Sequence, residues 1–216
     1  MQGTWLETET VVETVNWKGE PLQLSGVKAI KNTVTGEILV NPIEIARAEI
    51  RQIAKCHDLE PRDVATLLMI EAKPGYFKQG EVLFKYHLQK QLFYLMKALE
   101  KNGYGQSLPI DDFIPAKNGP KPKNLNDDLN RLVEKKLITI KKEKWDGQAH
   151  ESKRIILTAK GASVAESLWS DTPEPFKEVA IKVKERIHPL NPETVRHLVH
   201  IEYPEYKCTY TENDIE

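Results

Sequence analysis

Cysteine is scarce in this chain, whose 216 residues include only Cys56 and Cys208. Two cysteines so far apart cannot supply a disulfide framework, so a small cross-linked secreted domain is excluded. Long apolar runs are also lacking, and none approaches the roughly 18 residues that indicate a membrane helix. The first ten residues have neither a basic start nor an apolar stretch, which does not fit a signal peptide. We therefore expect a reduced, cytoplasmic protein that makes no membrane contact.

Motifs for catalysis and metal binding are missing as well. The chain has no glycine-rich phosphate loop and no nucleophile motif. His197 and His200 have helical spacing and Cys208 follows, but a third and a fourth ligand at convincing spacing are absent. Cys56 and His57 end an amphipathic stretch, which favours core or surface residues over a nucleophile and its base. We expect no enzyme, no metal site and no cofactor.

Charge is balanced overall but unevenly distributed. The chain has 31 Lys and Arg against 32 Asp and Glu, a formal net charge of −1. Residues 84–160 hold 16 basic and 9 acidic side chains, which leaves 15 and 23 for the rest. A basic segment inside an acidic chain is typical of a nucleic-acid-binding module carried on other parts. The alternative is that these lysines only form the solvated faces of helices and strands.

The spacing of apolar residues predicts an α+β chain that is mostly helical and has three parts. Residues 1–80 form a β-containing element with two amphipathic helices, and residues 81–170 form a second domain. Residues 171–216 form a pair of amphipathic helices and a polar tail. This pair either makes a homodimer or closes the core of its own protomer. A short helix is also expected at Ile110–Ile114.

The N-terminal part is dense in Thr and Val and is expected to form strands. Val27–Lys31 and Glu37–Val40 are expected to pair as a hairpin, with Gly36 supplying a positive φ in the turn. Asn41 can then cap a helix whose first residue is Pro42, because proline fits the first helical position.

The most informative order of elements lies in the middle of the chain. A polar-faced helix is predicted at Asn124–Lys136, where apolar residues recur every three or four positions. A strand at Leu137–Trp145, a polar turn and a second strand at Ser152–Thr158 follow. Thr158 is the expected N-cap of the next helix. Helix, two-stranded ribbon, helix is the order typical of a winged helix-turn-helix.

Two stretches carry a resemblance to the winged helix-turn-helix superfamily. Its recognition helix and following strand are similar to Arg131-Leu132-Val133-Glu134-Lys135-Lys136-Leu137-Ile138, and the segment after its wing to Ile156-Leu157-Thr158-Ala159-Lys160-Gly161. Members often have Gly where this chain has Lys136. The resemblance covers about residues 84–170. It implies a winged helix-turn-helix core in which residues 124–136 enter the major groove and the wing, residues 138–158, contacts phosphate or the minor groove.

The side chains that this resemblance assigns to duplex DNA are polar or basic. They are Lys121, Lys123, Asn124, Asn126, Asn130, Arg131, Lys135, Lys141, Lys142, Lys144, Lys153 and Arg154. Asn126 and Asn130 are expected to bond an adenine edge, and Arg131 a guanine. Asp127 and Asp128 interrupt this face. Because phosphates repel carboxylates, at least one of the two must point away or cap another group.

The DNA hypothesis describes a dimeric transcriptional regulator, in which Arg131→Ala with Lys142→Ala weakens binding without lowering the melting temperature. A second likeness supports a different function. Leu88–Leu95, and Gly119-Pro120 ahead of Leu125–Leu132, are similar to the Panacea domain of phage-associated and antitoxin-like proteins. Since several such proteins are thought to act by protein contact, the alternative is a winged-helix protein-interaction module, antitoxin-like or a regulatory adaptor, that does not bind DNA.

Overall fold

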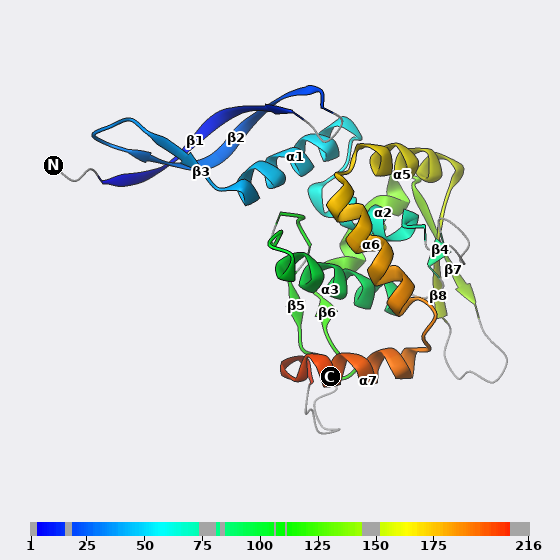
Figure 1. Cartoon of the computed structure of the whole chain (residues 1–216). Coiled ribbons are helices and arrows are strands. Elements are labelled where there is room, and N and C mark those ends of the chain that lie inside the picture. The colour runs from blue at the N-terminus through cyan, green and yellow to red at the C-terminus, as the bar shows by residue number, and fades with distance from the viewer. Residues whose placement is uncertain are drawn as a thin grey trace.

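The computed structural model describes residues 4–15, 19–73, 81–82, 85–105, 107–110, 112–143 and 152–207, which form an α+β fold dominated by helices (Figure 1). The α-helices are α1 (Pro42–Cys56), α2 (Pro61–Glu71), α3 (Lys85–Lys101), α4 (Leu125–Glu134), α5 (Ala159–Asp171), α6 (Glu174–Ile187) and α7 (Pro192–Glu202). The strands are β1 (Trp5–Val15), β2 (Pro21–Asn32), β3 (Ile38–Val40), β4 (Glu81–Val82), β5 (Phe113–Ile114), β6 (Lys121–Pro122), β7 (Ile138–Glu143) and β8 (Ser152–Leu157). A 3₁₀ helix, η1 (Pro204–Tyr206), follows α7.

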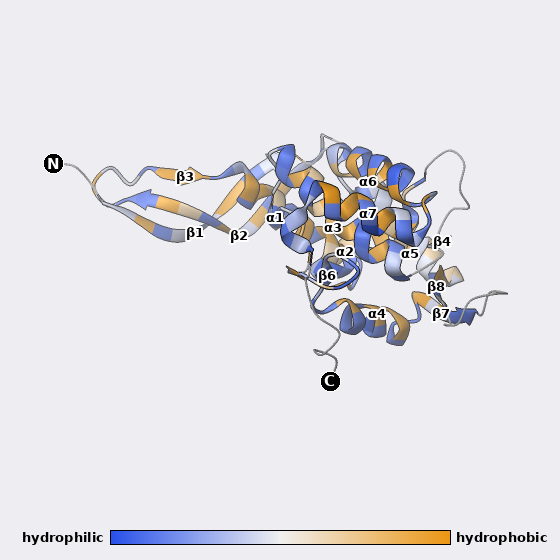
Figure 2. Cartoon of the chain, turned by 90° about the horizontal axis from the view of Figure 1, so that it is seen from below, coloured by the Kyte–Doolittle hydropathy of each residue, from blue (hydrophilic) through white to orange (hydrophobic). Residues whose placement is uncertain are grey.

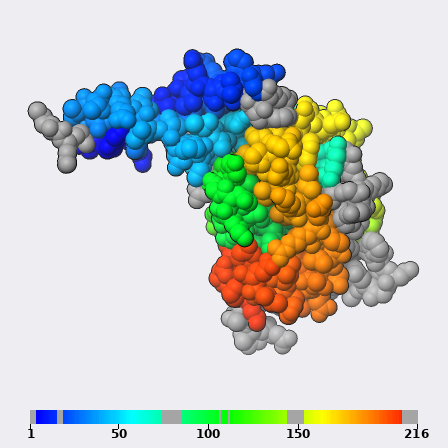
Figure 3. Space-filling model, in the orientation of Figure 1, coloured from blue at the N-terminus to red at the C-terminus, as the bar shows by residue number. Residues whose placement is uncertain are grey.

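The N-terminal strands form an antiparallel sheet in the order β1-β2-β3. Ala29 pairs with Val40 and Gly36 has a φ of 73°, so the predicted hairpin is confirmed. Leu24 and Val27 of β2 pack against Ala48 of α1 in a small core of their own. This sheet and α1 extend away from the rest of the molecule as an arm (Figures 1 and 3).

Helix α1 begins as its sequence predicts. The Asn41 side chain accepts a hydrogen bond from the Ile43 amide at 2.9 Å, and Pro42 is the first helical residue. The second half of α1 leaves the arm, because Ile50 and Ile53 are buried in the main core. The helix therefore joins the two cores.

The main core crosses the expected boundary at residue 80. Every residue of α2 from Asp63 to Glu71 is buried, and its apolar side chains share one core with α3, α4, α5, α6 and α7. On α6, Val179, Ala180 and Val183 are buried in the same core. The C-terminal helices thus close the core of their own protomer, which is the second of the two alternatives for them.

A second sheet lies on the opposite side of the body from the arm (Figure 1). Its strand order is β4-β8-β7, so a strand that precedes α3 pairs with the hairpin that follows α4. The expected helix at Ile110–Ile114 is wrong, since Phe113 and Ile114 form β5, which pairs with β6. Phe113 packs its ring against Phe93 at 5.2 Å, and this tertiary contact outweighs the local preference.

Candidate nucleic-acid interface

Helix α4 follows the predicted amphipathic pattern. Leu125, Leu129 and Leu132 recur at i, i+4 and i+7 and are buried in the main core. The opposite face is solvent-exposed and carries two amides, two carboxylates and one valine, namely Asn126, Asn130, Asp127, Glu134 and Val133. The exposed face of α4 is therefore polar but carries no positive charge of its own.

The end of α4 is a Schellman motif. The Leu137 amide donates to the Leu132 carbonyl and the Lys136 amide to the Val133 carbonyl, both at 2.9 Å. This geometry places Lys136 in the left-handed region, with a φ of 58°. Glycine adopts this conformation without strain, which explains why the winged helix-turn-helix pattern often has Gly at this position.

We expect Lys136→Gly to raise the free energy of unfolding by about 1 kcal/mol, because it relieves the left-handed strain of a residue with a Cβ. Urea unfolding measures the change. Lys136→Ala is the matched control, since it removes the same charge and keeps the strain. If both variants gained the same free energy of unfolding, the cause would be the loss of the lysine side chain and not the relief of strain.

The segment from Thr158 to Gly161 ties α5 to the end of α4. The Thr158 hydroxyl donates to the Lys136 carbonyl at 2.6 Å and accepts from the Gly161 amide at 2.9 Å, so the predicted N-cap is confirmed. Lys160 Nζ donates to the Lys135 carbonyl at 3.1 Å. A Cβ on Gly161 would lie only 1.7 Å from the Leu137 carbonyl oxygen. The residues that carry the superfamily resemblance therefore have a structural role in this chain.

The guanidinium of Arg131 is paired with carboxylates of the protein itself. Its Nη2 lies 2.6 Å from Asp63 Oδ1 and 2.7 Å from Asp128 Oδ1, and its Nε donates to Asp63 Oδ2 at 3.1 Å. Arg62 approaches Asp128 at 3.1 Å. The hydrogen bonds from Asp63 are the main cause of a raised pKa of Arg131, whereas burial raises the pKa of Asp128. This network joins α4 to α2 and withdraws Arg131 from the guanine-binding role expected of it.

The two adjacent carboxylates of α4 have different environments. Asp128 is buried and paired with the two arginines, whereas Asp127 is exposed on the outer face. One carboxylate points inward, as the repulsion argument required. Asp127 still faces solvent beside the predicted reading residues.

Three lysines from different elements converge beside the first turn of α4. Lys85 begins α3, Lys121 lies on β6 and Lys153 on β8, and the Lys85 ammonium donates to the side-chain oxygen of Asn126. The pKa of Lys85 is lowered, first by burial and then by the positive charges of Lys153 and Lys121. Within the described part of the chain none of these three lysines has an ion pair. We call Lys85, Lys121 and Lys153 the lysine cluster.

The hairpin carries further basic side chains, which alternate between its two faces. Lys142 lies directly opposite Lys153 in the antiparallel register, and Lys141 lies opposite Arg154. Like charges in facing positions destabilise a sheet. Arg154 compensates in part through an ion pair with Glu143 at 3.1 Å. Lys144 lies outside the described residues.

Two of the remaining predicted lysines form ion pairs within the protein. Lys123 pairs with Asp112 at 3.1 Å, and Lys135 Nζ contacts the carboxylate of Asp58 at 3.1 Å. Asn124 is the N-cap residue of α4.

Sequence reasoning missed Lys85, because nothing in its own neighbourhood indicates that the start of α3 faces β6 and β8.

Comparison of the chain with models of protein families and with curated protein sequences gives no match. No helix in the described ranges is long and apolar enough to cross a membrane. Among those same residues, no three His, Cys, Asp or Glu side chains are grouped as metal ligands would be. Cys208, which follows His197 and His200 in the sequence, lies outside the described residues.

Proposed function

We propose that this protein binds duplex DNA through the lysine cluster, the first turns of α4 and the β7–β8 hairpin. The observation that carries the proposal is the convergence of Lys85, Lys121 and Lys153 without an acidic partner among the described residues. Like charges held together raise the electrostatic free energy of the free protein, and a phosphate backbone would lower it. The N-terminal end of α4 adds a partial positive charge at the same place.

The order of elements supports a winged-helix interpretation of this surface. The elements α2, β4 and α3 come first, the β5–β6 pair follows, and α4 and the β7–β8 hairpin come next; β4 completes the sheet of the hairpin. In that interpretation the start of α3 and the hairpin contact phosphates on either side of α4. Asn130 is exposed and Asn126 is held by Lys85, so these two amides are the candidates for base contacts. Arg131 is left out because its guanidinium holds α4 on α2.

A fluorescence-anisotropy titration with random duplex DNA at two salt concentrations tests the proposal. We expect micromolar affinity that falls steeply as salt rises, since each phosphate contact adds about 0.9 to the salt slope. Replacing all three lysines of the cluster by Gln should weaken binding at least tenfold and flatten that slope.

The matched control replaces three exposed lysines elsewhere, Lys31 on β2, Lys55 on α1 and Lys182 on α6, by Gln. It removes the same charge and should leave most of the affinity. If both triple variants lost the same affinity for DNA, the effect would come from net charge alone. Undiminished binding by the cluster variant would refute the proposed surface.

The alternative is a protein-interaction module, and the arm favours it. Eight of the eleven exposed large apolar side chains in the described part of the chain lie between residues 5 and 39: Trp5, Leu6, Val11, Val15, Ile30, Val34, Ile38 and Leu39. Figure 2 shows the apolar positions along β1, β2 and β3. Clustered exposed apolar side chains are typical of a surface that another protein covers.

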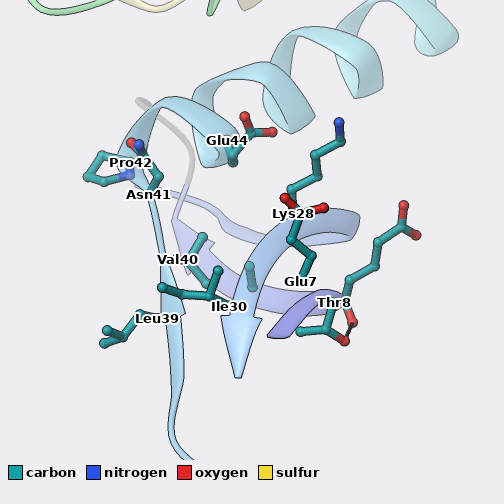
Figure 4. Close-up of a pocket in the computed structure, with 11 residues that line it drawn as sticks. Glu7, Thr8, Lys28, Ile30, Leu39, Val40, Asn41, Pro42 and Glu44 are labelled. Carbon is teal, nitrogen blue, oxygen red and sulfur yellow. Dashed lines mark hydrogen bonds between the residues drawn. The ribbon is translucent and has the colours of Figure 1, made fainter. Parts of the chain in front are cut away.

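The arm also has a cavity. A cavity of about 820 Å³ lies where β2 and β3 meet the start of α1. Figure 4 shows Ile30, Leu39 and Val40 together on the strands and Lys28 and Glu44 nearer the helix. An apolar wall with a charged rim suits a peptide segment of a partner. This alternative predicts no duplex binding in the titration and a specific protein that copurifies.

A further inference from the structure

A second basic site lies near the N-terminal end of α3, between α7 and residues 116–119. Ala116 forms a parallel β-bridge with Lys207, which brings this segment beside the residue that follows η1. A cavity of about 490 Å³ opens here. Its charged and titratable lining comprises five basic side chains and one acid: Lys117, Arg196, His197, His200, Lys207 and Glu193. With His neutral, three cations (Lys117, Arg196 and Lys207) face one carboxylate, so the cavity carries net positive charge although the whole chain is nearly neutral.

The single acid neutralises little of this charge. Glu193 is 4.0 Å from Arg196, and its side chain is 85% exposed. An exposed pair at this distance contributes little and leaves Arg196 able to bind another anion. The described part of the cavity thus has an excess of cationic donors over acceptors.

The inner wall has an unsatisfied polar atom. His200 Nε2 is buried and has no hydrogen-bond partner among the described residues. A buried nitrogen without a partner is costly. Burial lowers the pKa of His200, and the charges of Lys207, Arg196 and Lys90 lower it further.

Gly119 lies close to two nitrogen-bearing side chains. A Cβ placed on this residue would lie 3.6 Å from His200 Nε2 and 3.6 Å from Lys90 Nζ. Lys90 is buried, and its ammonium donates to the Pro120 carbonyl at 2.6 Å. Burial lowers the pKa of Lys90 to about 7. Gly119 has a φ of 81°, and of these two side chains only His200 lines the cavity.

We propose that this cavity binds the phosphate group of a small phosphorylated molecule, with Arg196 and Lys207 as its principal donors and the His200 ring beside them. Paired cationic side chains match the oxygens of a dianion. The volume exceeds that of a phosphate alone and falls within the usual range of small-molecule sites, so it leaves room for an organic substituent. The site uses none of the lysine cluster and does not depend on DNA binding.

An NMR titration of the His200 ring in the full chain, with inorganic phosphate as the probe, tests the site. At constant ionic strength, phosphate should raise the pKa of His200 by about one unit and should saturate, because a bound dianion stabilises the imidazolium. Sodium chloride should not. An equal response to chloride, or none to phosphate, would overturn the proposal.

The double variant Arg196→Gln, Lys207→Gln should bind phosphate at least tenfold more weakly, whereas Lys182→Gln on α6 should bind it normally. Both changes lie on exposed or half-buried side chains, and an unchanged unfolding temperature checks that the variant folds. Phosphate binding should persist when the lysine cluster is replaced, which separates this site from the DNA proposal. A His200 response to a duplex oligonucleotide but not to phosphate would assign the cavity to backbone phosphates and refute a small-molecule site.

Discussion

Gly161→Ala is expected to lower the free energy of unfolding by about 3 kcal/mol, or the unfolding temperature by about 9 °C. By helix propensity alone the change would stabilise α5, since alanine is favoured over glycine by about 1 kcal/mol. The sign reverses because the new methyl group would lie 1.7 Å from the Leu137 carbonyl oxygen. Backbone cannot yield as a flexible side chain does, so α5 must move away from the end of α4.

Thermal unfolding followed by circular dichroism measures the effect of this change. Ser163→Ala is the matched control, because it puts the same side chain two residues further along α5 at an exposed position. It should change the unfolding temperature by no more than about 2 °C. If both variants unfold at the temperature of the parent protein, α5 does not approach Leu137 as closely as described.

Arg131→Ala is expected to lower the free energy of unfolding by about 4 kcal/mol, because it leaves the carboxylate of Asp63 without its partner. Asp63 is fully buried and receives three hydrogen bonds from Arg131. This expected loss of stability contradicts the sequence-based prediction that Arg131→Ala with Lys142→Ala would leave the melting temperature unchanged. Any loss of DNA binding by that double variant would have to be corrected for unfolding.

A double-mutant cycle isolates the ion pair. Asp63→Ala in the Arg131→Ala background should cost less than Asp63→Ala alone, since the partner has already gone. Glu178→Ala provides the exposed comparison: Glu178 and Lys182 pair at 3.7 Å with both side chains more than half exposed. That change should alter stability by less than about 0.5 kcal/mol. Additive losses at Asp63 and Arg131 would show that the pair is not coupled.

Local patterns predicted many elements correctly. The apolar stripe of α4, the cap at Asn41 and the hairpin around Gly36 each depend on residues within a few positions of one another. Their physical causes, side-chain periodicity, amide capping and left-handed turns, act over that same range. The pattern also placed Thr158 as the N-cap of α5. The expected helix at Ile110–Ile114 failed because a ring contact with Phe93 on α3 determines that segment.

The candidate site was less predictable, because its residues come together from distant positions. Residue type alone placed Arg131 on a reading face, but its partner Asp63 lies 68 positions away and is visible only once α2 packs on α4. Lys85 was missed for the same reason, since only the packing of α3 beside β6 and β8 brings it to Lys121 and Lys153.

Local sequence patterns predicted the seven α-helices of the described residues, two of the five strand pairs there, the concentration of basic residues in the middle of the chain and the polar face of α4. Which charges are neutralised inside the fold, and which stay together at its surface, became visible with the packing of the elements. The reason is that an ion pair depends on distance and burial, both of which are set by packing between elements. That packing pairs Arg131 with Asp63 and Asp128, and it brings Lys85 beside Lys121 and Lys153.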